Sequence, residues 1–281
     1  MNNKKVSVII LTYNRADFVI KAVNSVLAQS YKDFELLIID DGSEDNTLKL
    51  LDKINDPRVK VFPLVHSGHI AKLRNFGIEN SKAGLISFLD SDDLWDTEYL
   101  ENLITEINKN NNLGFVFSDV EVMKYGKILQ KNIYKNLSDK DEGYNLFYKL
   151  IAGELIPIRP STLLFKRICL KETGIYNEIL LVGDYNFLLR LTYKFDGKLC
   201  GGTKVKVIKH NENISDIIQI KDFIEVIYTI EEFYENKAID KRLYKSRLYF
   251  FHFMILKKLI KKGNAIKALN QLLMIANILF K

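Results

Sequence analysis

The feature that most constrains the fold is a repeated alternation of apolar strands with helices over residues 1–100. Four runs rich in β-branched and other apolar residues, VSVIIL, FELLII, VKVFPLV and LISFLD, have the character of buried strands. Segments with apolar residues at helical spacing separate them, and the turns are short and polar. This order predicts βαβ units and a mostly parallel sheet flanked by helices, which is an α/β fold.

Polar residues follow three of these strands, at the points where the strands end. The segments are TYNR at 12–15, DDGS at 40–43 and DSDD at 90–93. Ligands of open parallel sheets bind at the carboxyl ends of the strands, so the sequence predicts a site at this edge. The last segment crowds Asp90, Asp92 and Asp93 together. Because like charges repel, we expect a cation among these carboxylates.

Three familiar classes of α/β protein fit this sequence poorly. A dinucleotide-binding domain requires a glycine-rich turn after the first strand, and TYNRADF contains no glycine. A nucleotidyltransferase would require a glycine-rich first loop with Arg and Lys, and a phosphatase with an aspartyl nucleophile carries its pair after the first strand rather than the fourth. The remaining use is a divalent ion, Mg²⁺ or Mn²⁺, shared between Asp-x-Asp and a diphosphate.

Four segments in order, VSVIILTYNR, LLIIDDGSEDNT, AKLRNFGIENSKAGLISFLDSDD and GDYNFLLRL, together resemble glycosyltransferase family 2. This large inverting family has the GT-A (Rossmann-like) fold and includes bacterial enzymes of surface-polysaccharide synthesis. The resemblance covers residues 4–215. It implies a GT-A domain over 1–215, with 1–100 as the nucleotide-binding half and 101–215 as the acceptor half, and a basic helical extension over 216–281.

The resemblance also implies a reaction. The expected enzyme moves a sugar with inversion from a nucleotide-diphosphate donor, with UDP-sugar as the best match, to a glycan or lipid-linked acceptor. Mn²⁺ or Mg²⁺ is the expected cofactor. The alternative is a non-catalytic scaffold subunit that keeps the fold and nucleotide-sugar binding. Gly183 favours this alternative, since family members usually carry an acid at that position.

The expected nucleotide-sugar contacts come by similarity from the strand ends and one helix. Asp41 would bind the base, and Asp90 would contact ribose or, through water, the metal. The full set is Thr12, Tyr13, Asn14, Arg15, Asp41, Arg74, Asn75, Asp90 and Ser91. The residues themselves leave other roles open, because Asp40 and Asp41 also suit the turn before Gly42 and Arg74 also suits a solvated helix face.

The metal and the catalytic base are likewise assigned by similarity. Asp92 would be the direct metal ligand, and His210 in VIKHNENIS would complete the metal or diphosphate site, where an imidazole favours Mn²⁺ over Mg²⁺. An exposed loop histidine is an equally open interpretation of His210. Asp184 would be the general base that takes the acceptor's proton, and it also suits the N-cap of the following helix. Asp93 also suits a helix start, with Asp96 or Thr97 as N-cap.

Composition narrows the cellular setting. Hydrophobic residues at 47% and charged residues at 27% are typical of a globular protein. The two cysteines show no CxxC spacing, no signal peptide is recognisable at the N-terminus, and no stretch reaches the ~20 apolar residues of a membrane span. We therefore expect a cytoplasmic protein, peripheral at most on the inner membrane face.

Positive charge is concentrated in residues 241–281, the last segment with a helical pattern. Residues 241–281 hold ten of the 41 Lys and Arg and no Asp or Glu. In its second half, Ile266, Leu269, Leu273, Ala276 and Phe280 form one apolar helical stripe. Two interpretations remain open, a peripheral contact with an anionic membrane and a helical hairpin packed on the catalytic domain. A nucleic-acid role is not expected, because the rest of the chain is mildly acidic and the tail lacks a recognisable module.

Overall fold

The computed structural model describes residues 5–134, 137, 144–154, 158–210 and 220–280. The chain divides into two compact units, Met1–Asn211 and Glu212–Lys281. The boundary expected between residues 215 and 216 lies outside the described residues.

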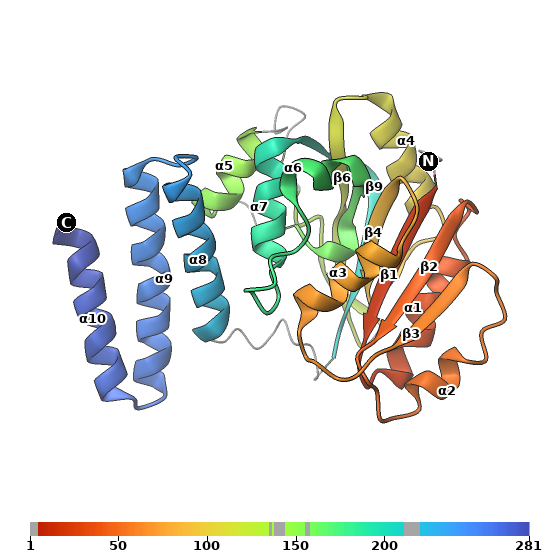
Figure 1. Ribbon diagram of the computed structural model, residues 1–281, viewed down its shortest axis with the longest axis horizontal. Helices are drawn as coiled ribbons and strands as arrows, with labels where there is room; N and C mark the ends of the chain where they lie inside the picture. The colour runs from red at the N-terminus through yellow and green to blue at the C-terminus, as the bar shows by residue number, and fades with distance from the viewer. Residues whose placement is uncertain (1–4, 135–136, 138–143, 155–157, 211–219, 281) are drawn as a thin grey trace. The chain divides into compact units, whose positions relative to one another are not determined.

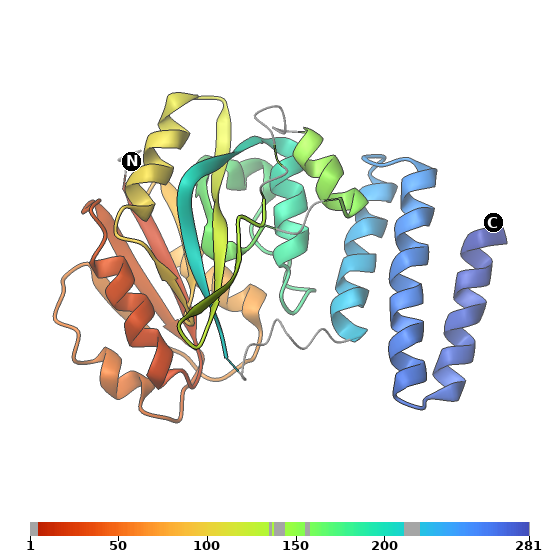
Figure 2. The same cartoon turned by 180° about the vertical axis from the view of Figure 1, so that it is seen from behind.

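The first unit begins with the parallel sheet that the alternating pattern predicts. Strands β1 (Val6–Thr12), β2 (Phe34–Asp40), β3 (Val59–Pro63) and β4 (Leu85–Asp90) lie in the order β3-β2-β1-β4, and all three pairings are parallel. The connections carry α1 (Ala16–Leu27), α2 (Thr47–Leu51) and α3 (Ile70–Asn80). α3 covers the sheet face seen in Figure 1, and α1 covers the opposite face, seen in Figure 2.

Beyond β4 the sheet continues with mixed pairing. It adds β8 (Leu163–Lys166), β6 (Leu113–Lys124), β9 (Asp196–Lys209) and β5 (Asp93–Trp95), in that order, and β7 (Lys127–Lys131) pairs with β6. The β4–β8, β8–β6, β6–β7 and β9–β5 pairs are antiparallel, whereas β6–β9 is parallel. The helices of this half are α4 (Tyr99–Lys109), α5 (Tyr144–Ala152), α6 (Leu170–Thr173) and α7 (Asp184–Lys194), with 3₁₀ turns η1 (Pro160–Thr162) and η2 (Arg167–Cys169).

The helix start expected around Asp93, with Asp96 or Thr97 as N-cap, is wrong. Residues 93–95 form strand β5, and the N-cap of α4 is Glu98, which makes no side-chain capping hydrogen bond. Pairing of β5 with β9, a strand more than a hundred residues later, decided this local structure over its helical signals.

The core lies between the sheet and its helices. Both strands and helices supply fully buried members, each worth roughly 1.5–3 kcal/mol when removed from water; those on strands include Val8, Ile9, Ile10, Leu36, Leu37, Ile38, Phe115, Phe117 and Phe165. Gly77 lets α3 approach β1 closely, because a Cβ there would lie 2.6 Å from Ile9 Cγ2. This close approach fixes the height of α3 above the sheet and therefore the position of its polar residues.

The second unit is helical, as expected for the extension. It contains α8 (Ile220–Glu235), α9 (Lys241–Lys261) and α10 (Ala265–Phe280), and α9 packs against both of the others. Asp240 caps α9 by accepting a hydrogen bond from Leu243 N–H at 2.7 Å. No helix within the described residues has the length and apolar character needed to span a bilayer.

Candidate active site

The polar strand ends lie at the same edge of the sheet. In the parallel registers Thr12 pairs with Asp40, and Leu11 pairs with Asp90. The segments TYNR, DDGS and DSDD therefore begin side by side, as the sequence predicts. Thr12 is buried, and its hydroxyl has no hydrogen-bond partner among the described residues.

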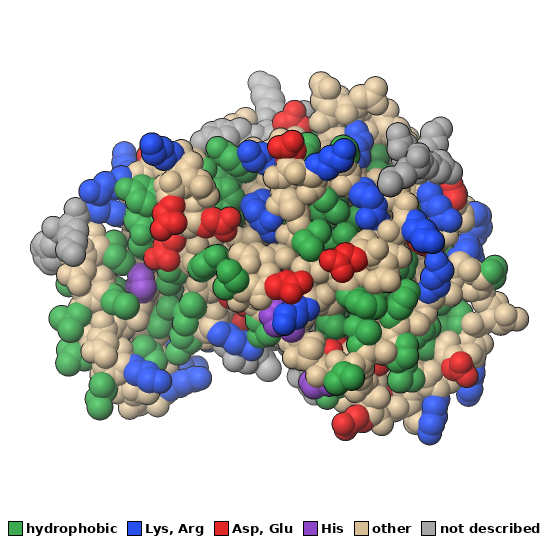
Figure 3. Space-filling model, in the orientation of Figure 1, with side chains coloured by type: hydrophobic (Ala, Val, Ile, Leu, Met, Phe, Trp, Pro, Cys, Tyr) green, Lys and Arg blue, Asp and Glu red, His purple; other side chains and the backbone are tan. Residues whose placement is uncertain are grey.

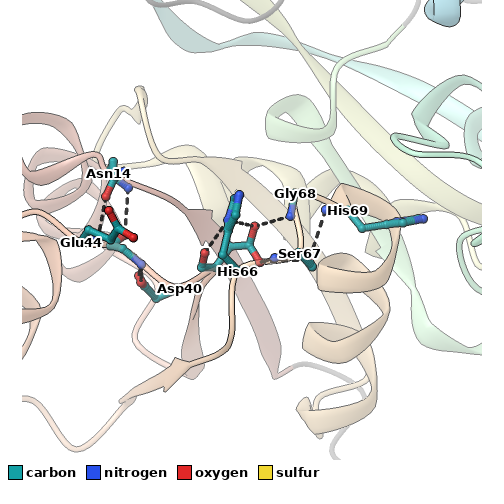
Figure 4. A network of polar contacts seen from close by, with 9 residues as sticks. Asn14, Asp40, Glu44, His66, Ser67, Gly68 and His69 are labelled. Atoms are coloured by element: carbon teal, nitrogen blue, oxygen red, sulfur yellow. Dashed lines mark hydrogen bonds and ion pairs between the residues drawn. The ribbon is translucent and has the colours of Figure 1, made fainter.

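Asn14 connects the end of β1 to the turn after β2. Its backbone lies in the left-handed region, with φ of 49°, a conformation that Asn tolerates better than most residues. Its N–H donates to Ser43 Oγ at 2.8 Å, and its Oδ1 accepts from Glu44 N–H at 2.8 Å (Figure 4). The N–H of Arg15 extends the connection by donating to Thr47 Oγ1 at 3.0 Å. These contacts give Asn14 a structural role, and its predicted donor contact stays a prediction.

Asp40 and Asp41, at the end of β2, accept hydrogen bonds from different loops. Asp40 is fully buried and accepts from Ser43 N–H at 2.9 Å, which is the turn role that the sequence allows. Asp41 turns to the segment before α3, where its Oδ1 accepts from Ser67 N–H at 2.9 Å and its Oδ2 from Gly68 N–H at 2.8 Å. Gly42 allows this approach, because its φ is 74° and a Cβ would lie 2.7 Å from His66 N.

His66 lies beside Asp41 in this candidate site, although the sequence analysis does not single it out. Its ring stacks on Tyr13, with centroids 4.1 Å apart. Its Nδ1 lies 3.0 Å from Asp41 Oδ2, and Figure 4 shows His66 with its neighbours Ser67, Gly68 and His69. Tyr13, His66 and Asp41 thus form one unit at the ends of β1 and β2. Only the glycine pattern around this loop signals it in the sequence, since Gly42 and Gly68 both have positive φ. A nucleobase contact by Asp41 stays a prediction.

The aspartates after β4 differ in environment. Ser91 and Asp92 form the turn between β4 and β5, and Asp93 is buried as the first residue of β5. Burial raises the pKa of Asp90, Arg74 opposes this increase, and Asp92 adds to it. Burial, followed by Asp90 and Asp92, raises the pKa of Asp93 well above its ordinary value. The crowding inferred from the sequence is therefore present in the fold.

Asp92 and His210 meet through strand pairing. β5 runs antiparallel to β9 with Asp93 opposite Val207, and this register brings the end of β9 to the turn after β4. His210 Nε2 lies 3.0 Å from Asp92 Oδ2, and its ring stacks on Phe18 of α1 with centroids 4.3 Å apart. The two residues expected to ligate metal are thus brought together, although their role is untested.

These donors suit an ion of the expected class. Within the described part of the chain, no three His, Cys, Asp or Glu side chains gather as a complete metal cage. A divalent ion that binds a nucleotide diphosphate takes one or two protein carboxylates and fills its shell with phosphate oxygens and water. Asp92 and His210 would hold such an ion, with Asp90 close enough to Asp92 to interact electrostatically.

Besides Arg74, a second cation lies near the acidic turn, Arg159, which the sequence analysis did not identify. It interacts electrostatically with Asp90 and Asp93, so it offsets part of their charge. It precedes Ser161, which accepts a hydrogen bond from Asp90 N–H at 3.1 Å and, through its carbonyl oxygen, from Trp95 Nε1 at 2.9 Å. No local pattern marks Arg159 in the sequence, because its place depends on β8 joining β4.

Arg74 projects from α3 to the predicted catalytic base. Its guanidinium forms an ion pair with Asp184 Oδ1 and lies over the rings of Tyr176 and Phe88, with its Cζ 5.2 and 5.7 Å from the centroids. Arg74 is only 4% exposed, so it is not part of a solvated helix face. Its Nε is buried and has no hydrogen-bond partner among the described residues.

Asp184 occupies the first turn of α7 and is not its N-cap. The N-cap is Gly183, with φ of 70°, and the Asp184 side chain makes no capping hydrogen bond. Because this backbone region costs an L-residue about 1–2 kcal/mol, the glycine has a local conformational reason. A helix N-terminus favours a carboxylate, which is consistent with an ionised Asp184. The missing acid at 183 therefore does not by itself indicate lost activity.

Asn75 positions the segment that leads to Asp184. Its Nδ2 donates to Tyr176 O at 2.9 Å and Glu178 Oε1 at 2.8 Å, and its Oδ1 accepts from Tyr176 N–H at 2.9 Å. The amide is buried and engaged at both ends. These contacts indicate a positioning role, and a direct contact with the sugar nucleotide stays untested.

Comparisons with known proteins agree with this geometry. The family model described as Glycosyl transferase family 2 matches residues 7–159. An uncharacterized glycosyltransferase of Rickettsia conorii (strain ATCC VR-613 / Malish 7) is 42% identical over 135 residues, which cover 48% of this chain and 21% of the relative. The Escherichia coli enzyme UDP-Glc:alpha-D-GlcNAc-diphosphoundecaprenol beta-1,3-glucosyltransferase WfgD is 34% identical over 131 residues, 47% of this chain and 51% of its own length.

Among solved structures, Staphylococcus aureus TarS 1–349 in complex with UDP-GlcNAc is similar with a TM-score of 0.69. The match covers 88% of this chain and 71% of that one at 22% identity. Identity at this level shows the fold alone, and the predicted GT-A fold is confirmed. The chain spans about a fifth of the length of the Rickettsia conorii relative and about half of the length of WfgD.

Proposed function

This chain belongs to glycosyltransferase family 2, and from that premise we propose that it transfers a sugar, with inversion, from a UDP-sugar to a lipid-linked acceptor in surface-polysaccharide synthesis. The observation that carries the proposal is the convergence of the strand ends of β1, β2 and β4 with Asp184 at one place. The WfgD relative, whose name gives UDP-Glc as donor and a diphosphoundecaprenol-linked sugar as acceptor, supports the substrate classes.

The donor would lie along the strand ends. The Tyr13–His66 stack offers an aromatic surface for the base, and Asp41 holds the loop that carries His66. The diphosphate would extend toward Asp92 and His210. A bound Mn²⁺ or Mg²⁺ would neutralise charge on the departing diphosphate.

Asp184 would act as the general base. The acceptor hydroxyl attacks the anomeric carbon and gives its proton to Asp184, while the bond from that carbon to the diphosphate oxygen breaks and UDP leaves with the electron pair. The ion pair with Arg74 engages Oδ1, so Oδ2 is the oxygen we propose for the proton. Arg74 holds the carboxylate in orientation, and the side chain of Asp184 remains 30% exposed for the acceptor to reach.

A screen of nucleotide sugars tests the proposal. Release of UDP is measured with Mn²⁺ and with chelator, in the presence of a polyprenyl-diphosphate sugar acceptor, for the wild type and for Asp184→Asn. We expect turnover with at least one UDP-sugar, and a loss of about 10²–10⁴-fold in Asp184→Asn with donor affinity retained. Donor binding without turnover in the wild type would instead support the scaffold alternative.

A further inference from the structure

Helix α10 packs against α9 with an unexpected face. The buried residues of its described part are Ala268, Gln271 and Ile275, and Gln271 Nε2 lies 2.6 Å from His252 Nδ1 of α9. The larger apolar side chains point the other way and are between 49% and 78% exposed: Ile266, Leu269, Leu272, Leu273 and Met274. A glutamine is buried in this helix while leucines are exposed, so packing among the described helices of the second unit leaves its apolar stripe uncovered.

Helical geometry places the two sets on opposite faces. At 3.6 residues per turn, Ile266, Leu269 and Leu273 form one stripe, and Ala268, Gln271 and Ile275 form another about half a turn away. The stripe that the sequence predicts as apolar is therefore the outward one. Of its predicted members, Ala276 is half-buried and the side chain of Phe280 lies outside the described part.

The charged side chains that α9 and α10 carry are all basic. Lys257, Lys258, Lys261 and Lys262 lie at the turn between α9 and α10, and Lys267 follows in the first turn of α10. Residues 241–281 contain no acid. Figure 3 shows exposed hydrophobic side chains along α10 with basic groups at the ends of the helices. Ile260 adds a further apolar side chain, 62% exposed, beside the lysines.

We propose that the outward face of α10 lies in the headgroup region of an anionic phospholipid bilayer, with the lysines of the α9–α10 turn on lipid phosphates. Insertion of the apolar side chains and attraction of the lysines to anionic headgroups both contribute to such binding. A second copy of the chain is the less suitable occupant, because its residues 241–281 offer no acid to these lysines, whereas an anionic bilayer offers phosphates. Any advantage of membrane binding for catalysis depends on the proposed lipid-linked acceptor. The binding of α10 to lipid does not depend on the proposed function.

Vesicle flotation of the full chain tests this inference. The wild type is compared with the double variant Leu269→Ser/Leu273→Ser on vesicles of phosphatidylcholine alone and with phosphatidylglycerol added. The matched control is Ile128→Ser/Leu129→Ser on β7, whose side chains are 45% and 61% exposed. Circular dichroism verifies that helix content is kept.

We expect the wild type to float only with anionic vesicles and to be released by salt. The α10 variant should lose at least about tenfold in partition coefficient, since two leucines leave the apolar phase, and the β7 control should bind like the wild type. Equal flotation of wild type and α10 variant would overturn the inference. So would a wild-type dimer in ultracentrifugation that the α10 variant dissociates.

The result of the flotation experiment can be distinguished from a test of the proposed function. UDP-sugar hydrolysis in solution, without acceptor lipid, should be the same in the wild type and the α10 variant. Flotation without any UDP-sugar turnover would sustain the lipid surface and contradict the enzyme proposal.

Discussion

The guanidinium of Arg74, in the middle of α3, forms an ion pair with the carboxylate of Asp184 at the start of α7. The segment before α7 is also tied to α3 by the hydrogen bond from Ala71 N–H to Leu181 O at 3.0 Å. A residue from the half that we propose binds the nucleotide therefore sets the position of the proposed base in the proposed acceptor half. This contact would connect the proposed donor and acceptor sites through one buried side chain.

Replacing Arg74 should lower kcat more than donor affinity. We expect Arg74→Lys to lose about tenfold in kcat and Arg74→Ala about a hundredfold, because a base displaced by about 1 Å loses its alignment. Steady-state kinetics and UDP affinity by calorimetry give the two quantities. Lys72→Ala, an exposed change on the same helix, is the control. A fall in UDP affinity with kcat unchanged would instead place Arg74 on the donor, as the resemblance implies.

Metal should strengthen donor binding through Asp92 and His210. We expect Mn²⁺ to tighten UDP-sugar binding to the wild type at least about tenfold, with this gain abolished in Asp92→Asn and reduced in His210→Asn. Calorimetry with and without Mn²⁺ measures the gain. Asp96→Asn serves as the control, because Asp96 is 51% exposed and pairs with Lys206. The metal assignment fails if Asp92→Asn keeps the full gain.

Gly42→Ala should weaken nucleotide binding by moving the His66 loop. The substitution meets both a positive φ and a backbone atom of His66 at 2.7 Å, so the loop must shift away from Asp41. We expect about a tenfold loss in UDP affinity and about 1–2 kcal/mol in stability. Gly201→Ala is the matched control, since a Cβ there meets nothing within 4 Å. Unchanged UDP affinity in Gly42→Ala would show that the loop does not serve the nucleotide.

Glu35 should make stability depend on acid pH. Burial opposes its ionisation, but hydrogen bonds from Lys82 N–H at 2.6 Å and Ser7 Oγ at 2.8 Å outweigh this and lower its pKa from 4.5. A lowered folded-state pKa gives stability that is complete above the unfolded value and is lost as pH falls through the folded value. At pH 7 we expect Glu35→Gln to lower the free energy of unfolding by about 1–2 kcal/mol.

Urea unfolding followed by the fluorescence of Trp95, the single tryptophan, reports on the unit that contains Glu35. The difference between wild type and Glu35→Gln should shrink below pH 4.5, the ordinary pKa of a glutamate, as the wild-type carboxylate takes up its proton. Glu79→Gln, at an exposed position, should show no such dependence. A constant difference between pH 7 and pH 3 would contradict the assignment.

Much of the parallel half of the sheet and its polar edge could be predicted from sequence. Strands β1, β2 and β4 are continuous apolar runs, and each ends where TYNR, DDGS or DSDD begins. These signals are local, since a run of apolar residues and the polar turn after it lie within about ten residues of each other. Parallel pairing then brings the turns to one edge without further information.

Side-chain partners could not be predicted in the same way. His66 stacks on Tyr13, yet only the glycines around its loop mark it in the sequence. Arg159 interacts with the acidic turn, and no pattern nearby in the chain marks it. The outward direction of the apolar stripe on α10 was equally hidden, because periodicity defines a stripe but not the neighbour it faces.

The sequence by itself determined the strands of the parallel half, β1 to β4, where the polar edge lies and which aspartates crowd there, because burial periodicity and turn chemistry act over short distances. Only the tertiary structure decided that Asp92 meets His210 and that Arg74 holds Asp184. These pairs depend on the register of β5 on β9 and on how closely α3 packs on β1, and such relations arise from the packing of distant segments.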